Sequence, residues 1–184
     1  MPLRTHLQLL YLLHLCKPAA DRVVFQAIYR AKAQRILELG LTSAKRTLRI
    51  LTAARLANPT KPPYYIGIDL FEERAPTAPP VWSLLEAYRT LRAAGAQVRL
   101  VPAEPAAGLM QVANELGKID LMLISAGSMP AENSHLWLFL PRMLNQQAVV
   151  LCQRLDKDNK ASFQCLDRAA LGQFAAAALK RRAA

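Results

Sequence analysis

Short apolar runs alternate with segments of helical periodicity along most of the chain. A strand of a parallel sheet, buried on both faces, reads as a continuous apolar run, whereas a helix repeats its apolar residues every three or four positions. The apolar runs predict five strands, at Arg35–Gly40, Tyr64–Leu70, Val98–Val101, Ile119–Ser125 and Ala148–Cys152. The segments before and between them predict helices at Asp21–Arg30 (with Asp21 as the cap), Ser43–Leu56, Val81–Ala94, Gly108–Leu116 and His135–Leu144.

This alternation predicts an α/β domain, a three-layer, doubly wound structure with a mainly parallel sheet and helices on both faces. Right-handed crossovers give the spatial strand order 3-2-1-4-5. Phe163–Leu166 is predicted as an antiparallel edge strand, and Asp167–Lys180 as a closing helix. The 184 residues contain no internal repeat and no linker, so we expect a helical extension over residues 1–20 and a single α/β domain over residues 21–184.

The N-terminal run Leu7–Cys16 follows Arg4 and has the length of a secretion-signal core. Gln8 and His14 interrupt this run, and no small-residue cleavage pattern follows it. We therefore expect an amphipathic helix that packs on the domain and ends near Pro18. A helix lying on a membrane surface is the alternative.

Hydropathy and cysteine usage predict the cellular compartment of the protein. No apolar run approaches the roughly 20 residues of a bilayer span. The three cysteines are widely spaced and form no Cys-x-x-Cys pair, which predicts neither a disulfide framework nor a metal site. The sequence thus predicts a cytoplasmic protein with no membrane partner.

Net charge is unevenly distributed along this basic protein. The chain has 24 Lys and Arg residues against 13 Asp and Glu residues, a net charge of +11. Up to Tyr64 there are 11 basic residues and only two acidic ones, Asp21 and Glu38. Such asymmetry suits nucleic acid, anionic lipid, an acidic partner or simply a solvated surface. Because the aromatic residues do not interleave with the basic ones as stacking platforms would, any nucleic-acid binding should be sequence-independent and salt-dependent.

Candidate ligand-binding residues follow the predicted strands. In an open parallel sheet, ligands bind beyond the carboxyl ends of the strands, where the strand order reverses. Asp69 ends the second strand, where a carboxylate can accept hydrogen bonds from both ribose hydroxyls of an adenosine ligand. A helix cap or a solvated loop carboxylate is the alternative for Asp69. Lys45 and Arg46 could meet an anion, but we expect them on a solvated surface.

The turn after the first strand excludes two common nucleotide sites. It retains only Gly40, whereas a nicotinamide-binding turn has the pattern Gly-x-Gly-x-x-Gly and a phosphate loop is similarly rich in glycine.

Several short sequence motifs occur in succession at or after the predicted strands. They are Ile36-Leu37-Glu38-Leu39-Gly40 with a small-residue turn, Tyr65-Ile66-Gly67-Ile68-Asp69, Glu104 and Ile119-Asp120-Leu121. Together, over about Val23 to Cys152, they resemble the successive motifs of class I S-adenosylmethionine-dependent methyltransferases. The resemblance implies a Rossmann-like sheet, a cofactor bound across the ends of the first and second strands, and methyl transfer from a sulfonium to an acceptor.

The resemblance also implies roles for the first turn. Gly40 would let the backbone approach the methionine part of S-adenosylmethionine, with Glu38 beneath it and Thr42 in the same turn. The turn of the family is Glu-x-Gly-x-Gly-x-Gly, and here Thr42 and Ala44 stand in place of its second and third glycines.

Further roles are implied beyond the second and third strands. Asp69 would hold the ribose hydroxyls. Leu70 or Phe71 would pack on adenine, and Glu104 would lie near its exocyclic amine. No catalytic residue is assigned, because methyl transfer is an in-line displacement in which positioning supplies much of the acceleration.

The sequence therefore predicts an S-adenosylmethionine-dependent methyltransferase whose acceptor, a small molecule or a macromolecule, is left open. The alternative is a catalytically silent methyltransferase-fold module that binds or scaffolds, with its basic N-terminal third contacting nucleic acid. The glycine replacements favour the alternative, whereas Glu38, Gly40 and Asp69 favour the enzyme.

Overall fold

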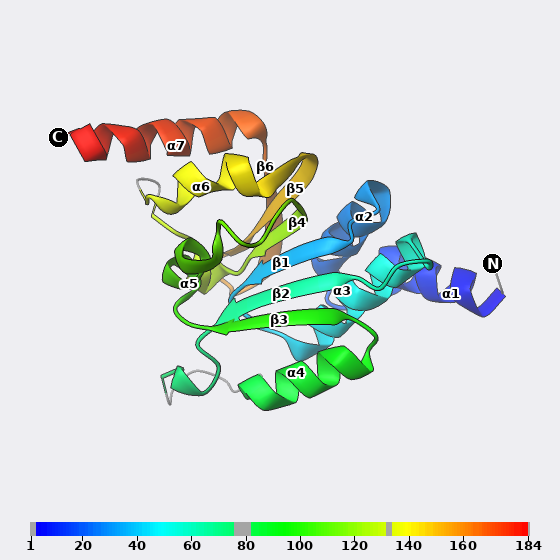
Figure 1. Cartoon of the computed structure of the whole chain (residues 1–184). Coiled ribbons are helices and arrows are strands. Elements are labelled where there is room, and N and C mark those ends of the chain that lie inside the picture. Colours follow the sequence, from blue (N-terminus) through cyan, green and yellow to red (C-terminus); the bar gives the residue numbers. More distant parts are fainter. Residues whose placement is uncertain (1–2, 76–81, 132–133, 184) are drawn as a thin grey trace.

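A six-stranded sheet in the order β3-β2-β1-β4-β5-β6 forms the centre of the molecule (Figure 1). The computed structural model of the chain describes residues 3–75, 82–131 and 134–183. Its strands are β1 (Arg35–Leu39), β2 (Tyr64–Asp69), β3 (Gln97–Pro102), β4 (Ile119–Ile124), β5 (Leu144–Leu155) and β6 (Ala161–Leu166). The first five are parallel, and β6 pairs antiparallel with β5. The predicted fold class, strand order and antiparallel edge strand are confirmed.

Helices cover both faces of this sheet, as predicted for a doubly wound domain. One face packs against α2 (Asp21–Ala31), α3 (Ala44–Ala57) and α4 (Leu84–Ala93). The other packs against α5 (Pro105–Val112), α6 (Leu136–Met143) and α7 (Arg168–Ala183). Apolar side chains of β1, β2 and β4 are fully buried between these layers, which explains why the strands read as continuous apolar runs.

The N-terminal segment is helical and packs on the domain. Helix α1 (Leu3–Leu10) continues into a π-helical turn, η1 (Tyr11–Leu15). Leu9, Leu12 and Cys16 are buried on the side that contacts α2 and α3. Within the described ranges, none of the helices combines the length and the apolar character of a bilayer span.

Element boundaries differ from the predicted ones where local caps or sheet pairing intervene. Helix α5 begins at Pro105 rather than Gly108, because proline suits the first turn of a helix and the Glu104 side chain caps it. The predicted helix start at Val81 lies outside the described residues. Helix α4 begins after Ser83, which forms a capping box with Glu86 in the first turn of the helix. Strand β5 starts at Leu144 because Ile119 of β4 already pairs with this residue.

Candidate functional site

A pocket of about 360 Å³ opens at the carboxyl ends of the central strands. It lies where the strand order reverses between β1 and β4, and its volume is within the roughly 300–1,000 Å³ usual for small-molecule sites. Five of the six predicted site residues line this pocket: Gly40, Thr42, Asp69, Leu70 and Glu104. The sixth, Glu38, is fully buried. The fold thus brings the predicted residues together, and their role in cofactor binding stays a prediction.

The Asp69 carboxylate is the most heavily engaged group at the pocket. It is only 3% exposed, so it is not a solvated loop carboxylate. Its Oδ2 atom accepts a hydrogen bond from the backbone amide of Leu41 at 2.5 Å, and its Oδ1 atom accepts one from the amide of Phe71 at 2.9 Å. These two bonds fix the carboxylate against the first turn and the start of η2 (Phe71–Glu73).

Arg74 occupies the remaining side of that carboxylate. Its Nε atom donates to Asp69 Oδ1 at 2.7 Å and its Nη2 atom to Oδ2 at 2.6 Å, a two-pronged ion pair. Nη2 also donates to the carbonyl of Leu41. Arg74 is not among the predicted site residues, because a single arginine five residues after a strand matches no motif. A ribose that uses Asp69 therefore has to displace this guanidinium.

Serine side chains close over Gly40. The residue has φ +75°, the left-handed region that favours glycine, and a Cβ here would lie 2.0 Å from Ser128 Oγ. Ser125 Oγ donates to the Gly40 carbonyl at 2.5 Å. Both serines belong to the segment around η3 (Ala126–Ser128), directly after β4. The space above Gly40 is thus filled by a side chain of the chain itself.

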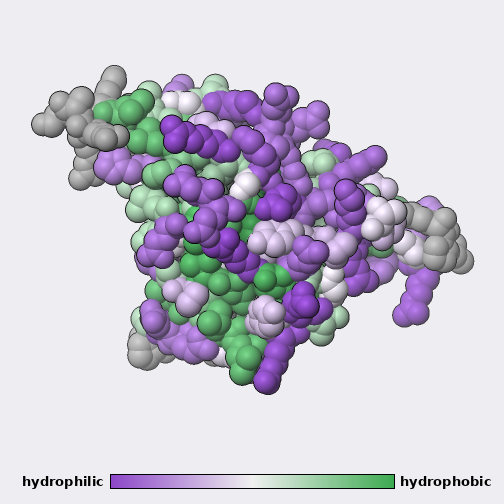
Figure 2. All heavy atoms as spheres, viewed as in Figure 1, coloured by the Kyte–Doolittle hydropathy of each residue, from purple (hydrophilic) through white to green (hydrophobic). Residues whose placement is uncertain are grey.

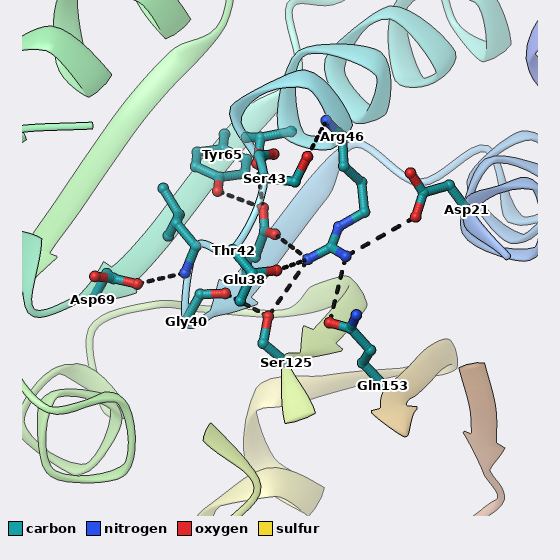
Figure 3. A network of polar contacts seen from close by, with 12 residues as sticks. Asp21, Glu38, Gly40, Thr42, Ser43, Arg46, Tyr65, Asp69, Ser125 and Gln153 are labelled. Carbon is teal, nitrogen blue, oxygen red and sulfur yellow. Dashed lines mark hydrogen bonds and ion pairs between the residues drawn. The ribbon is translucent and has the colours of Figure 1, made fainter. Parts of the chain in front are cut away.

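Glu38 is the acceptor of a buried hydrogen-bond network beneath the first turn (Figure 3). Its Oε2 atom accepts from Tyr65 Oη at 2.7 Å and from Thr47 Oγ1 at 2.9 Å. Burial, reinforced by the charge of Glu38, raises the pKa of Tyr65 well above its ordinary value. Tyr65 therefore remains a neutral donor to this carboxylate.

Arg46 joins the same network from α3, so the expectation of a solvated Arg46 is wrong. Its guanidinium lies 3.4 Å from the Glu38 carboxylate and 4.0 Å from that of Asp21. Further acceptors around it are Thr42 Oγ1 at 2.6 Å, Gln153 Oε1 at 3.4 Å and Ser125 Oγ at 3.5 Å. The cap predicted for Asp21 is also wrong, because its side chain points to Arg46 (Figure 3) and Ala20 is the cap residue. Two buried carboxylates require a buried cation between them. Lys45, in contrast, is exposed as expected.

The first turn is shaped by its cap rather than by further glycines. Ser43 caps α3 by accepting a hydrogen bond from the Arg46 amide at 3.2 Å. Neither Thr42 nor Ala44, both of which the structure describes, has a positive φ. Side chains at these two positions therefore cause no backbone strain.

Of the two residues considered for adenine, only Leu70 lines the pocket. Phe71 has φ +50° and is buried in a small cluster with Leu41 and Ala87. Glu104 is exposed, and its carboxylate accepts a hydrogen bond from the Ala107 amide at 2.8 Å, capping α5. Among the described residues, no cluster of His, Cys, Asp and Glu side chains is placed to hold a metal ion.

Comparison with known proteins finds similarity in structure only. No family model matches the sequence, and no curated protein matches it. A methyltransferase from Geobacter sulfurreducens is similar at 14% identity and a TM-score of 0.52 over 74% of this chain, which spans only 63% of that chain. An O-methyltransferase from Bacillus cereus in complex with SAH is similar at 14% identity and a TM-score of 0.52, covering 100% of this chain and 81% of that one.

A third similar structure is the O-methyltransferase TomG from Streptomyces achromogenes in complex with SAM, at 14% identity and a TM-score of 0.51, covering 100% of this chain and 78% of that one. The chain has the Rossmann-like fold of class I methyltransferases. At these identities the similarity concerns the fold alone.

Proposed function

We propose that this chain is an S-adenosylmethionine-dependent methyltransferase whose cofactor occupies the pocket at the carboxyl ends of β1 and β2. The observation that carries the proposal is the Asp69 carboxylate, which ends β2 and lines this pocket at the reversal of strand order. A carboxylate placed there can accept hydrogen bonds from both hydroxyls of a ribose. The shared fold with methyltransferases solved in complex with SAH and SAM supports the same class of ligand.

The residues of the pocket fit this ligand by chemical type. Asp69 would hold the ribose hydroxyls, Leu70 would offer an apolar surface to adenine, and the turn from Gly40 to Thr42 would adjoin the amino-acid part. When bound, the cofactor supplies an electrophilic methyl group on a sulfonium. The contribution of the chain is to orient the two reactants, for which no general base is required. Glu38 supports this site by fixing Arg46 and the turn above it.

Two side chains must move before the pocket can be filled. Arg74 has to leave Asp69, and Ser128 has to turn away from Gly40. Both obstacles are side chains on short segments after strands, so their displacement leaves the sheet unchanged. The apparent affinity of a ligand that binds only the open arrangement is reduced in proportion to the fraction of molecules that are open.

Calorimetric titration with S-adenosylmethionine and S-adenosylhomocysteine tests the proposal. We expect wild type to bind both compounds. Asp69→Asn should bind at least about tenfold more weakly, because the side-chain amide accepts hydrogen bonds only through its oxygen, whereas both carboxylate oxygens accept them. The variant also loses part of its contacts to the Leu41 and Phe71 amides, so its folding is checked by circular dichroism. Glu73→Gln, an exposed carboxylate outside the pocket, is the matched control and should bind as wild type does. An equal loss in both variants would contradict a specific role of Asp69.

The second candidate is a catalytically silent module of the same fold that binds or scaffolds. The observations that favour it are the Arg74 guanidinium on Asp69 and the Ser128 hydroxyl over Gly40, because the chain itself fills the two places that a cofactor would need. Failure of wild type and of Arg74→Ala to bind either compound at up to about 1 mM decides for this candidate.

A further inference from the structure

A stripe of exposed apolar side chains runs along the N-terminal helix. Leu7, Leu10, Tyr11 and Leu15 recur at the three- and four-residue spacing that places side chains on one side of a helix. They are 59%, 52%, 43% and 66% exposed, respectively. The other side of the same helix is buried against α2 and α3, so the stripe is a second apolar surface, whose three leucines are more than half exposed.

Basic side chains adjoin the C-terminal end of this stripe. Arg49 of α3 donates to Tyr11 Oη at 3.0 Å, and its guanidinium carbon lies 5.6 Å from the centre of that ring. The same arginine donates to the Lys17 carbonyl at 2.7 Å. The exposed Lys45 lies one helical turn before Arg49 on α3.

Further basic residues lie toward the N-terminal end. Gln8 of α1 shares a shallow surface pocket with Arg55 and Lys61, both of which are exposed. Arg4, also exposed, lies one turn before Leu7 on the helix. The stripe therefore has positive charge at both of its ends.

Acidic side chains of the same segment, residues 4–64, do not offset this charge at the surface. The two carboxylates among residues 4–64, those of Asp21 and Glu38, are buried around Arg46. Arg46 is also the one basic residue of the described part of this segment that is buried. The exposed charges of the segment are thus all positive. In the view of Figure 2, hydrophilic residues dominate the end of the molecule from which α1 projects.

We propose that α1 and η1 dock on an anionic phospholipid surface. The exposed leucines would enter the boundary between headgroups and acyl chains, and the basic side chains at the ends of the stripe would meet lipid phosphates. Nucleic acid would use the same charges but offers no apolar phase for the leucines, so we favour lipid. Docking departs from the predicted absence of a membrane partner, and it requires a helix on the surface rather than a span. It does not depend on the proposed methyltransferase activity.

The orientation of the molecule is compatible with such docking. Helix α1 lies on the opposite side of the molecule from α5, whose N-terminus borders the candidate pocket (Figure 1). A protein that docks through α1 would keep this pocket open to solvent.

Flotation of the full chain with vesicles tests the apolar part. The vesicles contain phosphatidylcholine with about 30 mol% phosphatidylserine, and pure phosphatidylcholine vesicles serve for comparison. The triple variant Leu7→Ser, Leu10→Ser, Leu15→Ser should bind at least about tenfold more weakly than wild type, because three insertable side chains are removed. The matched control is Leu85→Ser, Leu155→Ser, Leu179→Ser, whose leucines are 55%, 52% and 54% exposed elsewhere on the surface. The control should bind as wild type does.

A second pair of variants tests the position of the positive charge, because both variants lower the net charge by the same amount. Lys17→Gln, Lys45→Gln, Lys61→Gln should weaken binding to the anionic vesicles, while Lys118→Gln, Lys157→Gln, Lys160→Gln should leave it unchanged, although both sets remove three exposed lysines. Equal binding to neutral vesicles, equal losses in both sets, or no effect of the leucine variant would overturn the proposal. Binding of wild type to a short nucleic-acid duplex but not to anionic vesicles would overturn it in favour of nucleic acid.

Discussion

Two arginine–carboxylate pairs lie at the carboxyl ends of β1 and β2, in different surroundings. Arg46 lies between Glu38 and Asp21 beneath the first turn, with 4% of its side chain exposed. Arg74 pairs with Asp69 beside the candidate pocket, with 18% of its side chain exposed. Arg46 connects α2, α3, β1 and β5, whereas Arg74 follows its partner by only five residues.

The difference separates a buried ion pair from a partly exposed one at the wall of the pocket. Removal of Arg46 would leave two buried carboxylates without a cation, with Glu38 fully enclosed and the Asp21 side chain only 6% exposed. Water does reach part of Arg74, and the carboxylate it leaves would still accept bonds from two backbone amides. The same pairing chemistry is therefore buried in the fold in one place and lines a pocket in the other.

The largest expected effect is that of Arg46→Met on stability. The substitution retains a long side chain but leaves Glu38 and Asp21 unpaired, so the free energy of unfolding should fall by about 3–5 kcal/mol. Urea denaturation followed by circular dichroism measures this change. The neighbouring exposed Lys45→Met is the control and should stay within about 0.5 kcal/mol of wild type. A loss below about 1 kcal/mol for Arg46→Met would contradict a structural role for this pair.

Introducing glycine into the first turn should have the next largest effect. Neither Thr42 nor Ala44 has a positive φ, so glycine relieves no strain at either position. It adds freedom to the unfolded chain, and at position 42 it also removes the Oγ1 atom that accepts a hydrogen bond from Arg46. We expect Thr42→Gly together with Ala44→Gly to lower the free energy of unfolding by about 2 kcal/mol. Gly127→Ala is the converse control, because a Cβ there would meet open space and φ is not positive. It should be neutral or slightly stabilising. A double variant as stable as wild type would show that these positions are strained.

A smaller, pH-dependent effect is expected at Asp21. Burial raises the pKa of its carboxyl above the ordinary 3.8, against the lowering effect of Arg46. The native state therefore holds this proton more tightly than the unfolded chain, and the stability contributed by Asp21 falls as pH rises above about 4. In Asp21→Asn this decline is absent. Its stability relative to wild type should therefore rise as pH increases from about 4 toward 7, measured by urea denaturation. If the stability of Asp21→Asn relative to wild type fell as pH rises, the raised pKa of Asp21 would be contradicted.

The sequence predicted the sheet because the sheet depends on local patterns. The buried strands read as apolar runs, and right-handed crossovers leave few possible strand orders. The same rules placed Asp69 and Gly40 at the end of the sheet where the pocket opens. Positions after strands are therefore readable once the topology is known.

The side chains that contact these residues could not be predicted in the same way. Arg46 looked like a surface residue in the first turn of a helix, and only the packing of α2 against α3 brings Asp21 to it. Arg74 and Ser128 reach Asp69 and Gly40 through side-chain conformations that no periodicity encodes. Pairing across elements depends on three-dimensional packing, which a sequence pattern does not contain.

The measurement that tests the central claim most directly is calorimetric titration of S-adenosylhomocysteine into wild type, Arg74→Ala and Arg99→Ala. Arg99 pairs with Glu115 away from the pocket and controls for the loss of one arginine in an ion pair. If Arg74 competes with the ribose for Asp69, Arg74→Ala should bind about tenfold more tightly than wild type, about 1.4 kcal/mol, while Arg99→Ala is unchanged. Weaker binding by Arg74→Ala than by wild type would contradict the claim that this arginine closes the ribose site.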